Sequence, residues 1–217
     1  MTTMAELKQG AHNSALVRKI LSSVAFYAPY SAEMPTSYFS TGGVLAPAPT
    51  GFNPLGMTEK DDAFTFASDT DTEEVEAHGY SAAVRVDITK TTRTVASTFL
   101  ETRKETLELA TGTDLSNVTI DANGAIEIVE SETAARPFGR LVLIGADGVG
   151  EDEWFFIREY PRVQITDVAE QSWGTSALSY GLTWTAYPDP KLGFSVRQFI
   201  GGPAAAKNLE AMGFTAA

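Results

Sequence analysis

Residues 59 to 76 read EKDDAFTFASDTDTEEVE and bring eight carboxylates together with one positive charge, Lys60. After Lys60, no lysine or arginine occurs before Arg85. Carboxylates gathered in this way can ligate a divalent cation, transfer protons in catalysis, or repel another anion. The surrounding sequence distinguishes between these three roles.

The stretch Asp69-Thr-Asp71-Thr-Glu73-Glu74 is similar to the start of an EF-hand calcium loop. Such a loop requires glycine at its sixth position and a bidentate glutamate at its twelfth. This chain has Glu74 and Tyr80 at those two positions. We therefore predict no metal site in the acidic run.

Catalytic chemistry is not indicated either. The chain has two histidines, His12 and His78, and no cysteine. A Ser-His-Asp triad would depend on His78, and no G-x-S-x-G nucleophile elbow accompanies it. The glycine-rich residues 145–150 match neither a dinucleotide fingerprint nor a P-loop. We expect no catalytic residues and no cofactor, which favours a binding or structural protein.

The composition sets further bounds on function. The chain of 217 residues can bury one substantial core, and its net charge of −12 opposes a surface that grips nucleic-acid phosphates. The absence of cysteine excludes a disulfide scaffold and fits assembly in a reducing cytoplasm. No window approaches the roughly 20 apolar residues that cross a bilayer, so we expect no membrane association.

Most of the elements predicted from the sequence are strands, and they must position the acidic residues. Residues 83–88 alternate aliphatic and charged side chains, which is typical of a half-buried strand, and residues 94–100 predict a second strand. Thr102 and Glu105 have the spacing of a capping box, so we predict a helix from there to Gly112.

The second half of the chain continues in strands. Asn123-Gly124 supplies hairpin turn chemistry between residues 118–120 and 125–129. Pro203 opens a short helix that Gly213 closes. Other strands are predicted at residues 140–144, 153–160, 178–186 and 194–200. The predicted fold class is mainly β, an antiparallel sandwich or barrel with one flanking α-helix, a long loop and extended terminal arms.

The ends of the chain and one long loop complete the predicted organisation. Residues 1–22 form a polar, unpatterned arm, and residues 201–217 form a C-terminal extension. Between them lies a β domain at residues 23–200, which includes the long loop 30–57. Residues 24–29 fit either a helix end or a strand closed by proline, and we favour the strand.

The loop at residues 30–57 is rich in proline and glycine. Loops of this length are uncommon in compact domains and are usually functional or bound to a partner. It also carries apolar side chains that a solvated linker does not need: Tyr38, Phe39, Val44, Leu45 and Phe52. Two interpretations remain open, because the loop could pack on its own domain or reach a neighbouring subunit.

The order of these features resembles the major tail proteins of long-tailed bacteriophages, and in particular the tail tube proteins of phages that infect actinobacteria. The resemblance begins at Phe52-Asn-Pro-Leu-Gly56 and continues through the acidic run to Phe99-Leu100-Glu101-Thr102. It ends with GLTWTAYPDP at residues 181–190, and in all it covers residues 20 to 200.

The resemblance implies a tail tube of stacked hexameric rings, in which each subunit gives strands to a continuous β-barrel around a lumen. DNA leaves the head through that lumen without specific binding, and long loops and terminal arms link the rings. The implied location is the virion, after assembly in the host cytoplasm. The implied partners are other copies of the chain, the tape measure protein, and the tail terminator and distal tail proteins. The carboxylates would then repel DNA, and the candidate lumen-facing residues are Asp69, Asp71, Glu73, Glu74 and Glu76.

Three other interpretations remain. A carbohydrate- or receptor-binding β-sandwich would expose an aromatic cluster, which Trp154, Trp173 and Trp184 could supply, although the alternation around Trp184 predicts that it lies in a core. A hydrolase would require the carboxylates of residues 69–76 to face a pocket. Another virion component, such as a head decoration or tail terminator protein, is the nearest structural alternative.

Overall fold

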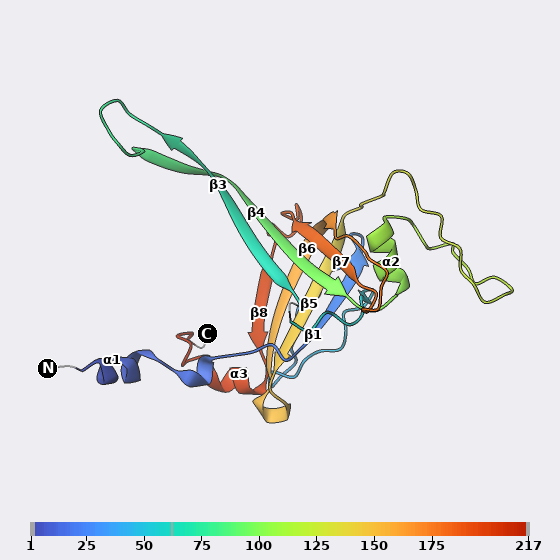
Figure 1. Ribbon diagram of the computed structural model, residues 1–217. Helices are drawn as coiled ribbons and strands as arrows, with labels where there is room; N and C mark the ends of the chain where they lie inside the picture. Colours follow the sequence, from blue (N-terminus) through green and yellow to red (C-terminus); the bar gives the residue numbers. More distant parts are fainter. Residues whose placement is uncertain (1–2, 62, 216–217) are drawn as a thin grey trace.

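The computed structural model describes residues 3–61 and 63–215, which build a single antiparallel sheet with helices at its margins (Figure 1). The strand order is β2-β1-β5-β6-β7-β4-β3, and β8 pairs with β6 beside this path. The strands are β1 (Ser22–Pro29), β2 (Asn53–Pro54), β3 (Thr65–Val75), β4 (Arg85–Phe99), β5 (Gly139–Asp147), β6 (Trp154–Val168), β7 (Tyr180–Ala186) and β8 (Arg197–Gly201). The helices are α1 (Met4–Ala11), α2 (Lys104–Thr111) and α3 (Pro203–Asn208), with short 3-10 turns η1 (Ser14–Leu16) and η2 (Gly150–Asp152). The predicted mainly β, antiparallel class is confirmed, and so is the strand favoured at residues 24–29.

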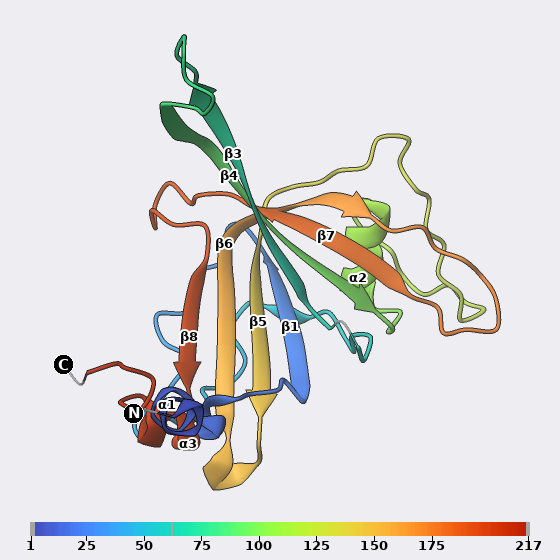
Figure 2. The same cartoon turned by 60° about the vertical axis from the view of Figure 1, so that its left-hand side comes forward.

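The sheet bends along β6, because the two halves of this strand have different neighbours. Its first half pairs with β5 and β8, whereas its last residues, from Val163 to Val168, pair with β7. The β5–β6 register shifts beside Pro161, which has no N–H to donate to the ladder, and the β6–β7 register shifts again at Thr166. As a result β7, β4 and β3 cross over the β1–β5–β6 part of the sheet (Figure 2).

The main core fills the space between these two parts of the sheet. Its buried side chains come from β1, β4, β5, β6 and β7, and α2 adds Leu107 at its margin. Along β7 the side chains alternate between core and surface, as the two-residue period of the sequence predicts. Trp184 is buried as predicted, and it packs edge-on against Phe99 with ring centroids 6.1 Å apart.

The hairpin of β3 and β4 differs from the sequence prediction. The two strands expected at residues 83–88 and 94–100 are one strand of 15 residues, and the acidic run itself supplies the paired strand β3. The intervening Thr89–Thr92 contains β-branched residues and no glycine, proline or asparagine, so nothing in it breaks an extended chain. The hairpin therefore reaches well beyond the body of the sheet (Figures 1 and 2).

The start of α2 also corrects a prediction. The capping residue is Arg103, whose side chain caps nothing, so the capping box expected from Thr102 and Glu105 does not form. The Thr102 hydroxyl lies 3.1 Å from the Tyr180 hydroxyl instead, because the core side of β7 offers it a partner. The predicted end of the helix is confirmed at Gly112, which adopts a left-handed conformation with φ of 67°.

The hairpin predicted around Asn123-Gly124 forms its turn but not its strands. Asp121 accepts hydrogen bonds from the backbone N–H groups of Asn123 and Ala125, both at 2.8 Å. The flanking residues 118–120 and 125–129 have no regular structure and lie in a long excursion between α2 and β5 (Figure 1). An isolated two-stranded hairpin is marginal in water unless one face packs on another element.

The N-terminal arm is more structured than the sequence predicts, and the helix predicted after Pro203 forms as α3. The arm contains α1, which begins with a capping box between Thr3 and Glu6 and lies away from the sheet (Figure 1). The segment predicted as a C-terminal extension begins with the last residue of β8, and its α3 packs on Trp154 through Ala204 and Ala205. Residues 201–217 therefore start inside the folded domain.

Candidate functional site

The acidic residues from Asp69 to Glu74 lie on β3, in the hairpin that extends from the sheet. All eleven residues of β3 are exposed, and so is Glu76, which follows the strand. Asp62 of the acidic run lies outside the described residues. The two clefts at the base of the hairpin are lined by none of the carboxylates from Asp69 to Glu76, and these carboxylates lie on an open surface.

Strand alternation divides the five candidate lumen residues between two faces. Asp69, Asp71 and Glu73 share one face of β3, whereas Glu74 lies on the opposite face, across from Val86. The register shift beside Asp71 leaves this alternation intact, because the extra residue is Thr89 on β4. The structure therefore does not bring all five carboxylates together.

The face that carries Asp69 continues across the sheet as a surface of small uncharged side chains, which we call the threonine face. The β3–β4 and β4–β7 registers place these residues on the side opposite the core. They are half-buried or exposed, whereas their strand neighbours Val95, Leu182 and Trp184 are buried. The threonine face consists of Thr65, Ala67, Thr94, Ala96, Thr98, Gln164, Gly181, Thr183 and Thr185. These nine residues include no lysine or arginine, whereas the distal hairpin carries Lys90 and Arg85 on the same side.

The opposite face of the distal hairpin is aliphatic. Val84, Val86 and Ile88 follow one another at two-residue spacing and are 52%, 55% and 70% exposed. The alternation predicted a half-buried strand, and within the described chain this face is not buried. We call Val84, Val86 and Ile88 the aliphatic row. The alternation predicts that these side chains are buried, but the subunit's own core does not bury them.

The predicted intersubunit loop packs largely on its own domain. Tyr38 and Phe52 are buried in a second core on the far side of β1 and β5, and Phe39 and Leu45 pack against its margin. Phe39 and Leu45 also form an isolated β-bridge with each other. Val44 stands apart because it is 56% exposed at the turn between them. Of the two interpretations left open, the structure shows packing on the domain itself for four of the five residues.

A buried polar network fixes this loop to the sheet. The Tyr38 hydroxyl donates to Glu159 Oε2 at 2.8 Å, and Arg197 Nε donates to Glu159 Oε1 at 2.5 Å. Arg197 also donates to the Pro35 carbonyl, so the arginine bridges β8 and the loop. Burial and the neighbouring Glu159 carboxylate raise the pKa of Tyr38 above its ordinary value, which keeps the hydroxyl a donor.

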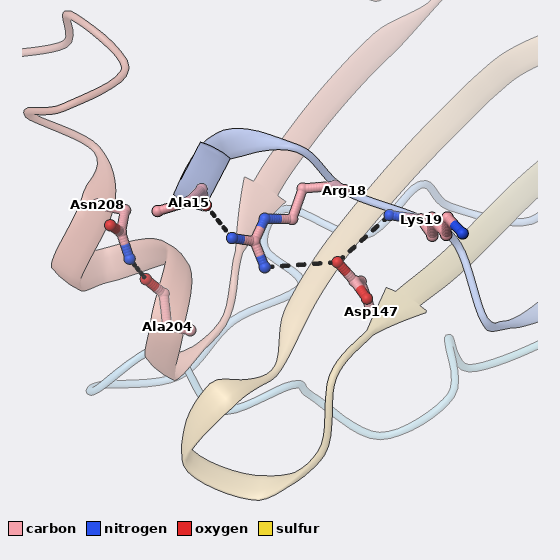
Figure 3. Close-up of polar contacts among 6 residues, drawn as sticks. All are labelled: Ala15, Arg18, Lys19, Asp147, Ala204 and Asn208. Carbon is pink, nitrogen blue, oxygen red and sulfur yellow. Dashed lines mark hydrogen bonds and ion pairs between the residues drawn. The ribbon is translucent and has the colours of Figure 1, made fainter. Parts of the chain in front are cut away.

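A second polar contact fixes the segment after α1 (Figure 3). Arg18 lies over the Trp154 ring at 4.5 Å and forms an ion pair with Asp147 at 3.5 Å, while its other nitrogen donates to the Ala15 carbonyl. The Lys19 backbone N–H also donates to Asp147. These contacts hold residues 14–19 on the end of β5, and the arm beyond them is free of comparable contacts in the described part of the chain.

The residues that could do chemistry are dispersed. His78 is exposed in the hairpin turn, and the described residues contain no group of histidine, aspartate and glutamate that could hold a metal ion. Of the three tryptophans, Trp154 and Trp184 are buried and Trp173 is 88% exposed, so they do not form one aromatic surface. No helix in the described ranges is long and apolar enough to span a bilayer.

Two features of the surface depend on strand pairing and are not predicted from the sequence. The threonine face has a sequence signal in the small side chains Thr94, Ala96 and Thr98 and in Thr183 and Thr185, although only the strand pairing joins the two runs. A concave surface that contains Arg93 and Arg158 had no sequence signal, because these residues lie 65 positions apart.

Comparison with known proteins gives three findings. Residues 11–199 match the phage tail tube protein family. A chain from the virion of a native gene transfer agent particle aligns with a TM-score of 0.35 and 10% sequence identity, over 68% of this chain and 88% of that chain. No curated protein sequence matches the chain.

Proposed function

This chain belongs to the phage tail tube protein family, and we propose that its copies assemble as stacked hexameric rings into the tube through which DNA leaves the phage head. The family makes the chain a structural protein of the virion that assembles with copies of itself into a phage tail. The parts that we propose are the six subunits in each ring, the stacking of the rings and the passage of DNA.

The observation that carries the proposal is the threonine face. A sheet that buries one side in a core and leaves the other side small, polar and uncharged is suited to line a wide aqueous channel. Six subunits that each contribute β3, β4, β6 and β7 would place their threonine faces around one lumen. The second core and the loop over it would then lie toward the outside of the tube.

The charges near this face support passage without binding. Double-stranded DNA carries one negative charge per ~1.7 Å of its axis, and lysine or arginine in the wall would hold it by counterion release. The hairpin extends the threonine face with four carboxylates, on Asp69, Asp71, Glu73 and Asp87. Lys90 and Arg85 lie on the same side across from β3, so this extension keeps a net negative charge. Charges within about 8 Å of a phosphate repel it at physiological salt. Several carboxylates around each ring would keep the wall non-adhesive.

The remaining contacts of the tube follow from the exposed segments. We propose that Val44, α1 and the excursion at residues 113–138 contact neighbouring subunits or rings. Val44 is exposed at the loop turn, and the other two segments leave the body of the subunit (Figure 1). The tape measure protein would occupy the lumen before DNA, and tail terminator and distal tail proteins would close the two ends. Assembly would take place in the host cytoplasm.

Two linked experiments test this function. The purified chain, concentrated stepwise to hundreds of micromolar, should form rings or tubes that light scattering and negative-stain microscopy detect. Changing Asp69, Asp71 and Glu73 together to lysine should leave the subunit folded, because exposed charges contribute little to stability, and should make its tubes retain DNA at low salt.

The matched control has the same change in charge elsewhere. Lysine at Glu127, Glu130 and Glu132, which are exposed in the excursion, should not cause DNA retention. Equal DNA retention by both triple variants would contradict the assignment of the lumen. A strictly monomeric chain at every concentration would contradict the assembly itself.

A further inference from the structure

The base of the hairpin encloses a cleft with two arginines. The cleft has a volume of about 690 Å³ and lies between β3 and β4 on one side and β6, β8 and the turn before β8 on the other. Its lining combines Arg93 and Arg158 with the apolar side chains of Phe66, Phe194 and Val196. We call it the arginine cleft.

Neither guanidinium of the arginine cleft has a carboxylate partner among the described residues. Arg158 lies over the Phe66 ring at 3.8 Å from its centroid, and Arg93 Nη1 donates to Ser195 Oγ at 3.3 Å. Five other arginines form ion pairs within the subunit: Arg18, Arg85, Arg103, Arg140 and Arg197. Arg136 and Arg162 instead donate to backbone carbonyls. Two unpaired cations beside apolar side chains in a concave surface are suited to a segment that is both apolar and acidic.

The distal hairpin is such a segment. Its aliphatic row runs along one face of β4, and Glu74 lies on that same face because it pairs across the strands with Val86. No ion pair of Glu74 is formed within the described chain. The hairpin extends away from the body in both views, so its tip does not return to the cleft at its own base (Figures 1 and 2).

We propose that the aliphatic row of one subunit docks in the arginine cleft of the next copy of the chain, with Glu74 paired to Arg158. This inference rests on the proposed function and names the contact that joins subunits within it. The occupant is a second copy because the same chain presents an apolar, acidic row and an apolar, cationic cleft on different surfaces. Such a contact is head-to-tail, and head-to-tail contacts generate closed rings when the rotation between copies closes.

Docking of the hairpin would explain the exposed aliphatic row and the position of Arg158 in the isolated subunit. The alternation at residues 84–88 predicts a buried face, which the docked hairpin would acquire. Arg158 is half-buried and lies over the Phe66 ring, so its guanidinium is positioned before a partner arrives. Docking would also cover the row that a free subunit exposes to non-specific association.

A charge exchange tests the pairing. Glu74→Arg and Arg158→Glu should each reduce the assembled fraction about tenfold or more, measured by sedimentation velocity and microscopy, because each places like charges together in a desolvated contact. The double variant that carries both changes should regain assembly. The control Glu73→Arg makes the same charge change one residue away, on the opposite face of β3, and should assemble as the unmodified chain does.

Circular dichroism of each variant separates lost assembly from lost folding. Because Arg158 contacts Phe66 inside the subunit, Ile88→Asp serves as a second disrupting variant, and at 70% exposure it does not enter the subunit core. If the single variants assemble normally while the unmodified chain forms tubes, or if the double variant does not recover, the pairing is wrong and the tube function stands. If the unmodified chain forms no tubes, the proposed function itself fails.

Discussion

The hydroxyl of Tyr38 offers a direct measure of how firmly the long loop belongs to its own subunit. Tyr38→Phe removes the donor 2.8 Å from the fully buried Glu159, while the ring keeps its edge-on contact with Phe199 at 5.0 Å between centroids. A hydrogen bond to a charged group contributes about 1.5–3 kcal/mol, and an acceptor left unpaired in the interior raises the cost. Arg197 still donates to the other oxygen, so Glu159 keeps one partner.

We therefore expect Tyr38→Phe to lower the free energy of unfolding by about 1.5–3 kcal/mol. For a chain of this length that corresponds to a fall in Tm of roughly 3–12 °C. Urea and thermal unfolding of the unassembled subunit would measure it. The matched control is Tyr80→Phe, because Tyr80 is 73% exposed at the hairpin end and its hydroxyl has no hydrogen-bond partner in the described chain. A Tyr38→Phe variant as stable as the control would refute the view that the network fixes the loop to the sheet.

Two further predictions concern the same subunit. Gly139→Ala should destabilise it by about 1–3 kcal/mol in urea unfolding, because the added methyl group would overlap the Tyr27 ring, whereas Gly174→Ala has open space and should change little. Raising the pH from 10 to 12 should also destabilise it, because burial, with a smaller effect of Glu108, raises the pKa of Tyr27 to about 12. An unfolded tyrosine ionises near 10, so this contribution is complete below pH 10 and is lost as the pH rises through 12. Tyr27→Phe should reduce the fall in the urea midpoint over that range without abolishing it, because burial also raises the pKa of Tyr38 and of Tyr160.

The sequence predicted those elements whose pattern is local. The two-residue period of residues 178–186 identified β7 and the burial of Trp184, and Pro203 and Gly112 marked a helix start and a helix end correctly. These signals depend on alternation and on backbone preferences within a few residues. They do not depend on which strands later become neighbours.

The errors arose where a distant partner decides the outcome. Thr102 fits a capping box, but Tyr180 takes its hydroxyl. The apolar side chains of the long loop looked available to another subunit, yet Tyr38 meets Glu159 across 121 residues of sequence. Residues 118–120 and 125–129 have the sequence pattern of strands. They pair with no strand of the described subunit, and they have no regular structure. No window of sequence contains this information.

The aliphatic row shows that a sequence can encode the assembled state and not the isolated subunit. Burying a side chain of this kind contributes roughly 1.5–3 kcal/mol of stabilising free energy. Burial of the three residues of the row on assembly would therefore stabilise the contact by several kcal/mol, which the isolated subunit does not gain. In the proposed contact each copy offers one row and one arginine cleft. An open chain of copies always leaves one row and one cleft exposed at its ends, whereas a closed ring leaves neither. Ring closure therefore gains one complete contact without the cost of bringing in another subunit, which favours a ring of fixed size over an open filament of the same contact.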